Sequence, residues 1–192
     1  MNTLAFFAIL LLAQFVAIVT QHLVPGIAPL YDARPLIFPV LLAYGALALP
    51  FSGMLSLAFF SGLLWDALTT QFYLQRGAAI GAGPRLGVEI ALGWSILLYA
   101  ALGTLIHGLR PLFLRGRWDV HCLASGVCTI VILLSEYLLI TFRRGGLIFP
   151  QALWPRIALP GFFAMVMAPL VYFVFNSIAN LINYPVRDEP AT

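Results

Sequence analysis

The chain has 192 residues, of which 62% are hydrophobic and 9% are charged, and its formal net charge is +3. Globular chains in water are about 45–50% apolar and about 25% charged, so a soluble fold would leave much of this apolar surface exposed. A helix needs about 20 apolar residues to cross a membrane. The composition therefore predicts an all-α integral membrane protein and excludes tandem soluble domains.

Six apolar segments follow one another along the chain, and they predict six transmembrane helices in one compact bundle. The first segment begins without a basic region and exceeds the roughly 7–15 apolar residues of a signal peptide core, so we interpret it as a retained helix. We expect a single membrane domain over residues 1–192, with helices at about 3–24, 36–50, 53–70, 89–108, 120–142 and 157–182.

The second and third segments form a predicted hairpin, because Pro50 and Gly53 stop one helix and let the chain reverse within a few residues. The second segment is short for a full crossing. It is expected to tilt little, to begin nearer Ala33 or to break at Pro39.

Two connections are distinctive. The longest, residues 71–88, contains several glycines and is predicted to be a flexible excursion. The stretch 143–156 combines arginines with Phe149 and Trp154, a mixture typical of chain that lies at the level of the lipid headgroups.

All the basic residues are arginines, and they form no stripe, so nucleic acid is not an expected partner. Scattered loop arginines usually determine topology, and binding of membrane lipid phosphates is the alternative role. Their placement does not decide the orientation. The side that carries the N-terminus has fewer arginines, but three of them lie in the short connection 109–117, where dense charge counts most.

Four ionisable residues stand at the level of the membrane. Inserting each of them costs about 2.5–3.5 kcal/mol, so we expect those that are present to be paired or functional. Arg34, Asp66, Glu89 and Glu136 lie at the starts of even segments or the ends of odd ones, so all four share one membrane face. One interpretation is a polar cluster in which Arg34 bridges Asp66 or Glu136 and clamps three helices together. The other is that each charge reaches the interface separately.

No catalytic, cofactor-binding or metal-binding residues are predicted, and we expect no cofactor and no enzymatic activity. His22, His107 and His121 are isolated from one another and are more typical of structural residues. Cys122 and Cys128 lie on different faces of one apolar segment, so neither a disulfide nor a metal site is supported.

Pairs of small residues recur at four-residue spacing, which lets helix backbones approach closely. They predict compact packing and a surface for one partner helix. The pairs are Ala13 with Ala17, Ser52 with Ser56, Ala124 with Cys128, and Ala164 with Ala168.

The hairpin carries a recognisable pattern. Arg34-Pro35 opens it, a run rich in leucine leads through Tyr44 to Pro50, and Gly62-Leu63-Leu64-Trp65-Asp66 closes the next helix. This resembles the rod-shape-determining membrane protein family MreD. The short arginine-bearing loop 109–117 and Glu136-Tyr137-Leu138 also look like that family, whereas the loop 71–88 is longer and the basic C-terminal tail is reduced to Arg187.

The resemblance implies a non-enzymatic scaffold of the bacterial cell-elongation machinery, which synthesises peptidoglycan and maintains rod shape. Its implied partner is MreC and, through MreC, MreB, RodA and a class B penicillin-binding protein. It also implies a multi-pass protein of the bacterial cytoplasmic (inner) membrane with both termini in the cytoplasm, which places Arg34, Asp66, Glu89 and Glu136 at the outer face.

A second hypothesis belongs to another class, the substrate-binding S subunit of an energy-coupling-factor vitamin transporter. Such subunits are also compact six-helix proteins, and Ala13-Gln14-Phe15-Val16-Ala17 resembles the small-residue motif with which they dock their coupling protein. The hairpin pattern favours the scaffold over the transporter subunit. In addition, no pocket with several polar and aromatic ligand contacts is evident in the sequence.

Overall fold

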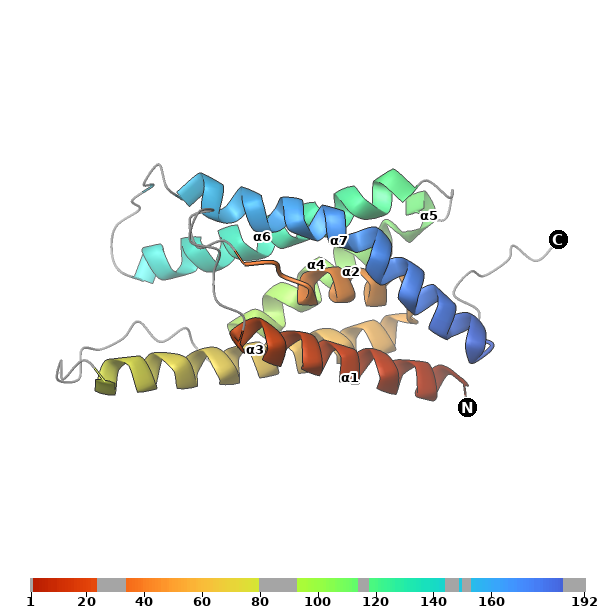
Figure 1. Cartoon of the computed structure of the whole chain (residues 1–192), viewed down its shortest axis with the longest axis horizontal. Coiled ribbons are helices and arrows are strands. Elements are labelled where there is room, and N and C mark those ends of the chain that lie inside the picture. The colour runs from red at the N-terminus through yellow and green to blue at the C-terminus, as the bar shows by residue number, and fades with distance from the viewer. Residues whose placement is uncertain are drawn as a thin grey trace.

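In a computed structural model of the chain, most of the described residues are helical (Figure 1). It describes residues 2–23, 34–79, 93–113, 118–143, 149 and 153–184, without the side chains of 22, 69–79, 112, 113, 118, 119 and 143. The helices are α1 (Asn2–Leu23), α2 (Phe38–Ala48), α3 (Phe51–Ala79), α4 (Trp94–Gly108), the single turn α5 (Arg110–Phe113), α6 (Trp118–Arg143) and α7 (Leu153–Leu181).

The all-α prediction is confirmed, and four of these helices are long and apolar enough to cross a membrane, which is consistent with a membrane protein. The spans are Asn2–Gln21, Phe51–Leu68, Val120–Phe142 and Leu153–Leu181. Helices α2 and α4 have 11 and 15 residues. At 1.5 Å per residue they are about 16 and 22 Å long, shorter than the roughly 30 Å of a hydrocarbon core.

Three predicted boundaries are wrong. The fourth helix, predicted to begin at about 89, begins at Trp94 after Gly93. Helix α3 continues to Ala79, so the first part of the predicted excursion at 71–88 is helical, because no glycine or proline interrupts the chain before Gly77. Helix α7 begins at Leu153, and Trp154 therefore belongs to the helix. Pro155 is compatible with this start, since a first-turn residue needs no N–H donor. The rest of the excursion lies outside the described residues.

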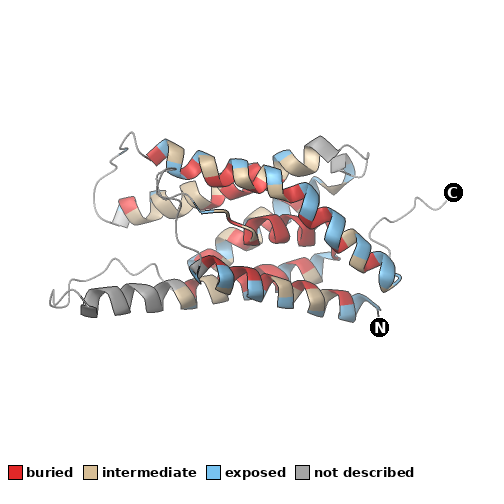
Figure 2. Ribbon diagram, viewed as in Figure 1, coloured by how far each residue is buried: buried red, intermediate tan, exposed pale blue. Residues whose placement is uncertain are grey.

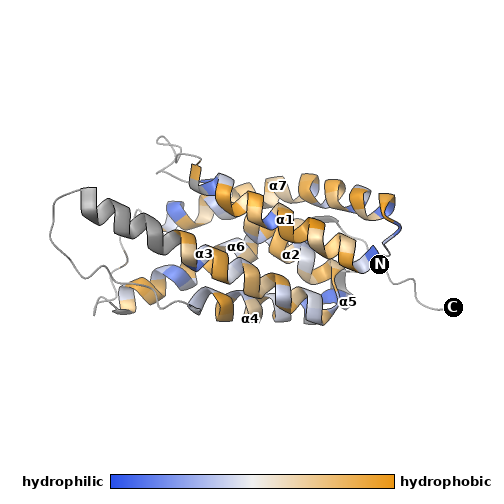
Figure 3. Cartoon of the chain, turned by 90° about the horizontal axis from the view of Figure 1, so that it is seen from below, coloured by the Kyte–Doolittle hydropathy of each residue, from blue (hydrophilic) through white to orange (hydrophobic). Residues whose placement is uncertain are grey.

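Helix α2 occupies the centre of the bundle. It contacts α1, α3, α4, α6 and α7, while α3 packs mainly on α4 and α6 mainly on α7. In Figure 1, α2 and α4 lie between a layer of α1 and α3 and a layer of α6 and α7. Every residue of α2 is buried, as the continuous red ribbon in Figure 2 shows. By contrast, apolar residues cover much of the outward surface of α1 and α7 (Figure 3).

Prolines explain why α2 is short. Pro39 lies in its first turn, where a missing N–H is tolerated, so this residue starts the helix instead of breaking it. Pro50 forces the preceding Leu49 into an extended conformation (φ −91°, ψ 156°) and ends it. The next helix begins at once, since the N–H of Met54 donates to the carbonyl of Pro50 at 2.9 Å.

The first and last helices meet at one end of the bundle. The side-chain amide of Asn2 donates to the carbonyl of Asn183 at 3.5 Å, and the rings of Phe6 and Tyr184 stack at 4.4 Å. The single turn α5 also lies at this end (Figure 1). The start of α1, the end of α7 and the 109–113 segment therefore share one side.

Candidate functional site

The amino end of α2 is closed by two glutamines of α1. With its amide oxygen turned toward the chain, Gln21 accepts from the backbone N–H groups of Ile37 and Phe38 at 2.6 and 2.8 Å. Gln14 donates through Nε2 to the carbonyl of Phe38 at 3.3 Å. Both glutamines are buried. The first N–H groups of a helix have no acceptor within the helix, so Gln21 supplies the acceptor that water cannot supply here, whereas Gln14 ties α1 to a carbonyl of the first turn.

The carboxyl end of α2 is closed from two other directions. Nδ1 of His107, at the end of α4, lies 2.8 Å from the carbonyl oxygen of Ala46. Because a carbonyl only accepts, this nitrogen carries the proton. The hydroxyl of Tyr184, just after α7, donates to the carbonyl of Ala48 at 2.9 Å. His107 is thus a structural donor, as expected for an isolated histidine.

The middle of α2 is tied to α7. The hydroxyl of Tyr44 donates to Oδ1 of Asn176 at 3.0 Å. Its ring meets those of Tyr172 and Phe175 at centroid distances of 5.0 and 5.6 Å. Helix α2 is therefore held at both ends and at its centre by side chains of other helices.

Asp66 joins α3 to the start of α4. This buried carboxylate accepts from the backbone N–H of Gly93 at 2.7 Å. Gly93 has φ +103°, a conformation that favours glycine, and it caps α4. One turn earlier on α3, a Cβ on Gly62 would lie 2.5 Å from the backbone of Ile96, so only glycine allows α4 to come this close. Gly62 and Asp66 together fix the α3–α4 contact.

Glu136 of α6 lies beside this joint. It accepts a long hydrogen bond of 3.4 Å from the hydroxyl of Tyr99 and a second from the indole of Trp65, and it interacts electrostatically with Asp66. The structure thus brings Asp66 and Glu136 together. The ring of Phe38 stacks on Trp65 at 4.7 Å and contacts Tyr99 at 5.5 Å, which places the two acids next to the amino end of α2.

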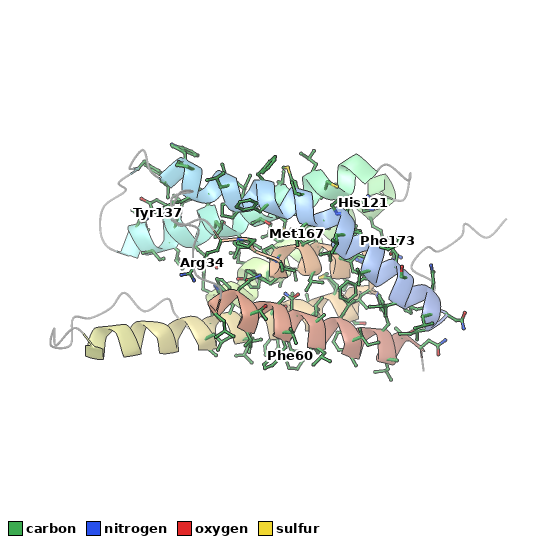
Figure 4. All side chains as sticks on the ribbon, viewed as in Figure 1. Arg34, Phe60, His121, Tyr137, Met167 and Phe173 are labelled. Carbon is green, nitrogen blue, oxygen red and sulfur yellow. The ribbon has the colours of Figure 1, made fainter. Side chains whose placement is uncertain are left out.

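Arg34 does not form the clamp that was one of the two interpretations of the sequence. Its side chain is exposed, and among the described residues it makes no ion pair with Asp66 or Glu136. Figure 4 shows Arg34 on the segment that leads into α2. The donors of Gly93, Tyr99 and Trp65 occupy the acids in its place. Glu89, the fourth residue of the predicted cluster, lies outside the described residues.

The other candidate residues have positions of their own. His121 packs edge to face on Tyr172 at 5.1 Å, and the side chain of His22 is outside the description. Cys122 is half-buried and Cys128 is buried, and neither forms a disulfide with a described residue. Within the described parts of the chain no group of three metal-ligating side chains occurs.

Most of the small-residue pairs are used inside the chain. Ala17 is buried and Ala13 packs against the core, so the pair in α1 does not offer an open face. The pairs in α6 and α7 also face inward, and only Ser52 and Ser56 are both exposed. At the contact between α6 and α7, Gly126 faces Gly161, and a Cβ on Gly161 would lie 2.5 Å from the side chain of Ile130.

Sequence reasoning missed the capping side chains Gln21 and Tyr184 and the turn residue Gly93. A usable signal existed for the glutamines, because a polar amide inside an apolar first segment requires a buried partner. Comparisons with known protein families, curated proteins and solved structures found no match for the chain.

Proposed function

We propose that this protein is a non-enzymatic membrane scaffold of the bacterial cell-elongation complex, with the role of the MreD family. It holds the single-pass protein MreC and, through it, MreB filaments, RodA and a class B penicillin-binding protein. The observation that carries the proposal is the hairpin pattern, in which Arg34-Pro35 precedes α2 and the run from Gly62 to Asp66 lies in α3. This run does not close the helix as predicted, because α3 continues to Ala79.

The geometry of the hairpin supports this proposal, because each element of the pattern has a physical task. Pro50 ends α2, Gly62 admits the backbone of α4, and Asp66 binds the N–H of Gly93 at the start of α4. A pattern whose residues build one rigid joint is typical of a scaffold, since its purpose is to hold helices in fixed positions.

The proposed topology has six crossings in the bacterial inner membrane, with both termini in the cytoplasm. The meeting of Asn2 with Asn183 supports an even number of crossings. Helices α2 and α4 are short crossings, and the helices around α2 keep its ends from lipid. In this orientation the acids Asp66 and Glu136 lie toward the outer face.

The transporter hypothesis receives less support. Its docking motif requires an accessible small-residue face on α1, but Ala17 is buried within the chain. The amino end of α2 would be a natural anion site, as in transporters with interrupted helices, but Gln21 already fills it. Tight copurification of a vitamin with the isolated protein would revive this hypothesis.

Co-purification from detergent tests the scaffold role. The protein and a tagged MreC from the same organism are co-expressed, with an unrelated tagged single-pass protein as control. We expect MreC, and not the control, to retain the protein through size-exclusion chromatography. Equal recovery with both baits, or with neither, contradicts the proposal.

The topology is tested by cysteine labelling of intact cells in a variant without Cys122 and Cys128. A membrane-impermeant maleimide should modify a cysteine placed at Gly81 and should miss one placed at Gly116 until the cells are permeabilised. The reverse pattern inverts the proposed orientation without affecting the MreC test.

A further inference from the structure

One end of the bundle carries exposed aromatic side chains. Helices α4 and α7 begin there with Trp94 and Trp154, which are 39% and 60% exposed. Phe149, just before α7, is 51% exposed and contacts the ring of Tyr137 near the end of α6 at 6.2 Å. Exposed tryptophan and tyrosine side chains in membrane proteins concentrate at the level of the headgroups. This end therefore marks an interface with the lipid headgroups.

Two exposed arginines stand at the same end. Arg34 precedes α2, and Arg156 lies in the first turn of α7 beside Trp154. Neither makes an ion pair with a described residue. The acids nearest in depth to Arg34 already bind other donors, since Asp66 accepts from Gly93 and Glu136 accepts from Tyr99. Within the described residues, therefore, no acidic side chain occupies either guanidinium group, and both are exposed at the surface.

The contact between α2 and α7 sets the relative depth of these arginines. Tyr44 and Tyr172 meet at 5.0 Å, and the two helices run in the same direction (Figure 1). From Tyr44 back to Arg34 the chain passes through six residues of helix and the short non-helical segment 34–37, at most about 22 Å in all. The same distance along α7 leads from Tyr172 to within about one turn of Arg156. The two arginines therefore lie at similar depth on neighbouring elements.

We propose that Arg34 and Arg156 form a binding site for the phosphodiester headgroup of an anionic phospholipid. A guanidinium presents several N–H donors in a plane that matches phosphate oxygens, and it is more weakly hydrated than an ammonium. The acyl chains lie along the apolar surface of α7, where Phe162 and Val166 follow Trp154 and are 60% and 58% exposed. A lipid headgroup would give Arg34 a partner, since Arg34 makes no ion pair with Asp66 or Glu136.

Thermal unfolding in detergent with added lipid tests the site. The wild-type protein is measured with phosphatidylglycerol and, separately, with phosphatidylcholine at the same concentration. We expect phosphatidylglycerol to raise the Tm by several degrees more than phosphatidylcholine. The variant Arg34→Gln/Arg156→Gln should lose this difference and keep the Tm that the wild type has without added lipid.

Two controls make the result decisive. Arg187→Gln removes an arginine that follows the opposite end of α7, and it should keep the full phosphatidylglycerol effect. Inorganic phosphate replaces the lipid in a third arm and should leave the Tm unchanged. An undiminished lipid effect in the double variant overturns the proposal, as does an equal loss in Arg187→Gln. Stabilisation by inorganic phosphate alone would identify a free-anion site and would overturn the lipid assignment.

Discussion

The two ends of α2 are closed by different chemistry. At the carboxyl end, His107 and Tyr184 donate directly to the backbone carbonyls of Ala46 and Ala48, in the last turn of the helix. At the amino end, the neutral amide of Gln21 accepts from the backbone N–H groups of Ile37 and Phe38. The carboxylates of Asp66 and Glu136 lie nearby and would be the usual choice for the positive end of a helix dipole, but they bind donors elsewhere.

The neutral side chains and the carboxylates thus have different roles, since the first cap α2 and the second join neighbouring helices. The neutral caps complete the hydrogen bonds of a helix that is too short to cross the membrane by itself. The acids connect neighbouring helices, and Asp66 in particular fixes the start of α4 through Gly93. Removing a cap should loosen α2 locally, whereas disturbing the joint should destabilise the whole bundle. Variants at the joint are therefore expected to lose more unfolding free energy than variants at the caps, and Arg34 is expected to lose the least.

The joint itself should be the most sensitive site. Gly62→Ala places a Cβ against the backbone of Ile96, so α3 and α4 must separate, and we expect a loss of about 3 kcal/mol in unfolding free energy. Gly108→Ala is the matched control, because a Cβ there meets nothing within 4 Å. Unfolding in mixed micelles measures both variants. Equal stability of the two would show that the close approach at Gly62 is not required.

Removing the carboxylate is expected to cost somewhat less. Asp66→Ala leaves the buried N–H of Gly93 without its charged acceptor, which predicts a loss of about 2 kcal/mol. Asp66→Asn retains an acceptor oxygen and should lose less than half as much. Thermal unfolding in detergent compares them. If Asn and Ala are equally damaging, the negative charge matters more than the hydrogen bond to Gly93.

The caps at the carboxyl end of α2 should have moderate effects. His107→Ala removes the donor to Ala46 and Tyr184→Phe removes the donor to Ala48, so each should cost about 1 kcal/mol. Tyr184→Phe is the cleaner test, because the ring that stacks on Phe6 is retained. Unchanged unfolding of Tyr184→Phe in detergent would show that solvent replaces this donor.

Arg34 should have the smallest effect on folding. As an exposed residue without an ion pair among the described residues, Arg34→Ala should change the unfolding free energy by less than about 0.5 kcal/mol. Its effect should add to that of Asp66→Ala in the double variant. A coupling energy above about 1 kcal/mol would restore the clamp between Arg34 and Asp66.

Hydrophobic segments predicted much of the fold. The apolar stretch 120–142 corresponds closely to α6, and the turn at Pro50 correctly separates α2 from α3, because both signals are local. Alternation of direction also indicated that Asp66 and Glu136 share one level. The partners of these acids were not predictable, since the N–H of Gly93 and the hydroxyl of Tyr99 depend on how α4 packs.

The same limit left two interpretations of Arg34 open, a clamp and a separate surface charge. In the sequence, an arginine and two acids appear at one level of the membrane, so an ion pair between them looks favourable. The neutral N–H and O–H groups that can bind the acids in its place are not evident from the sequence. The folded chain satisfies the acids with N–H and O–H groups brought by α3 and α4, and Arg34, on the segment before α2, is exposed at the surface. Burial of Ala17 likewise depends on the position of α1 in the bundle.

Hydrogen exchange measured by mass spectrometry tests most directly whether α2 is stabilised at both ends by side chains of other helices. In the variant Gln21→Leu/His107→Leu, the peptide that covers 36–48 should exchange at least about tenfold faster than in the wild type, since both ends lose a partner. Peptides from the centre of α6 should be unchanged. Equal protection of α2 in both proteins, or a uniform loss over all helices, would contradict this account.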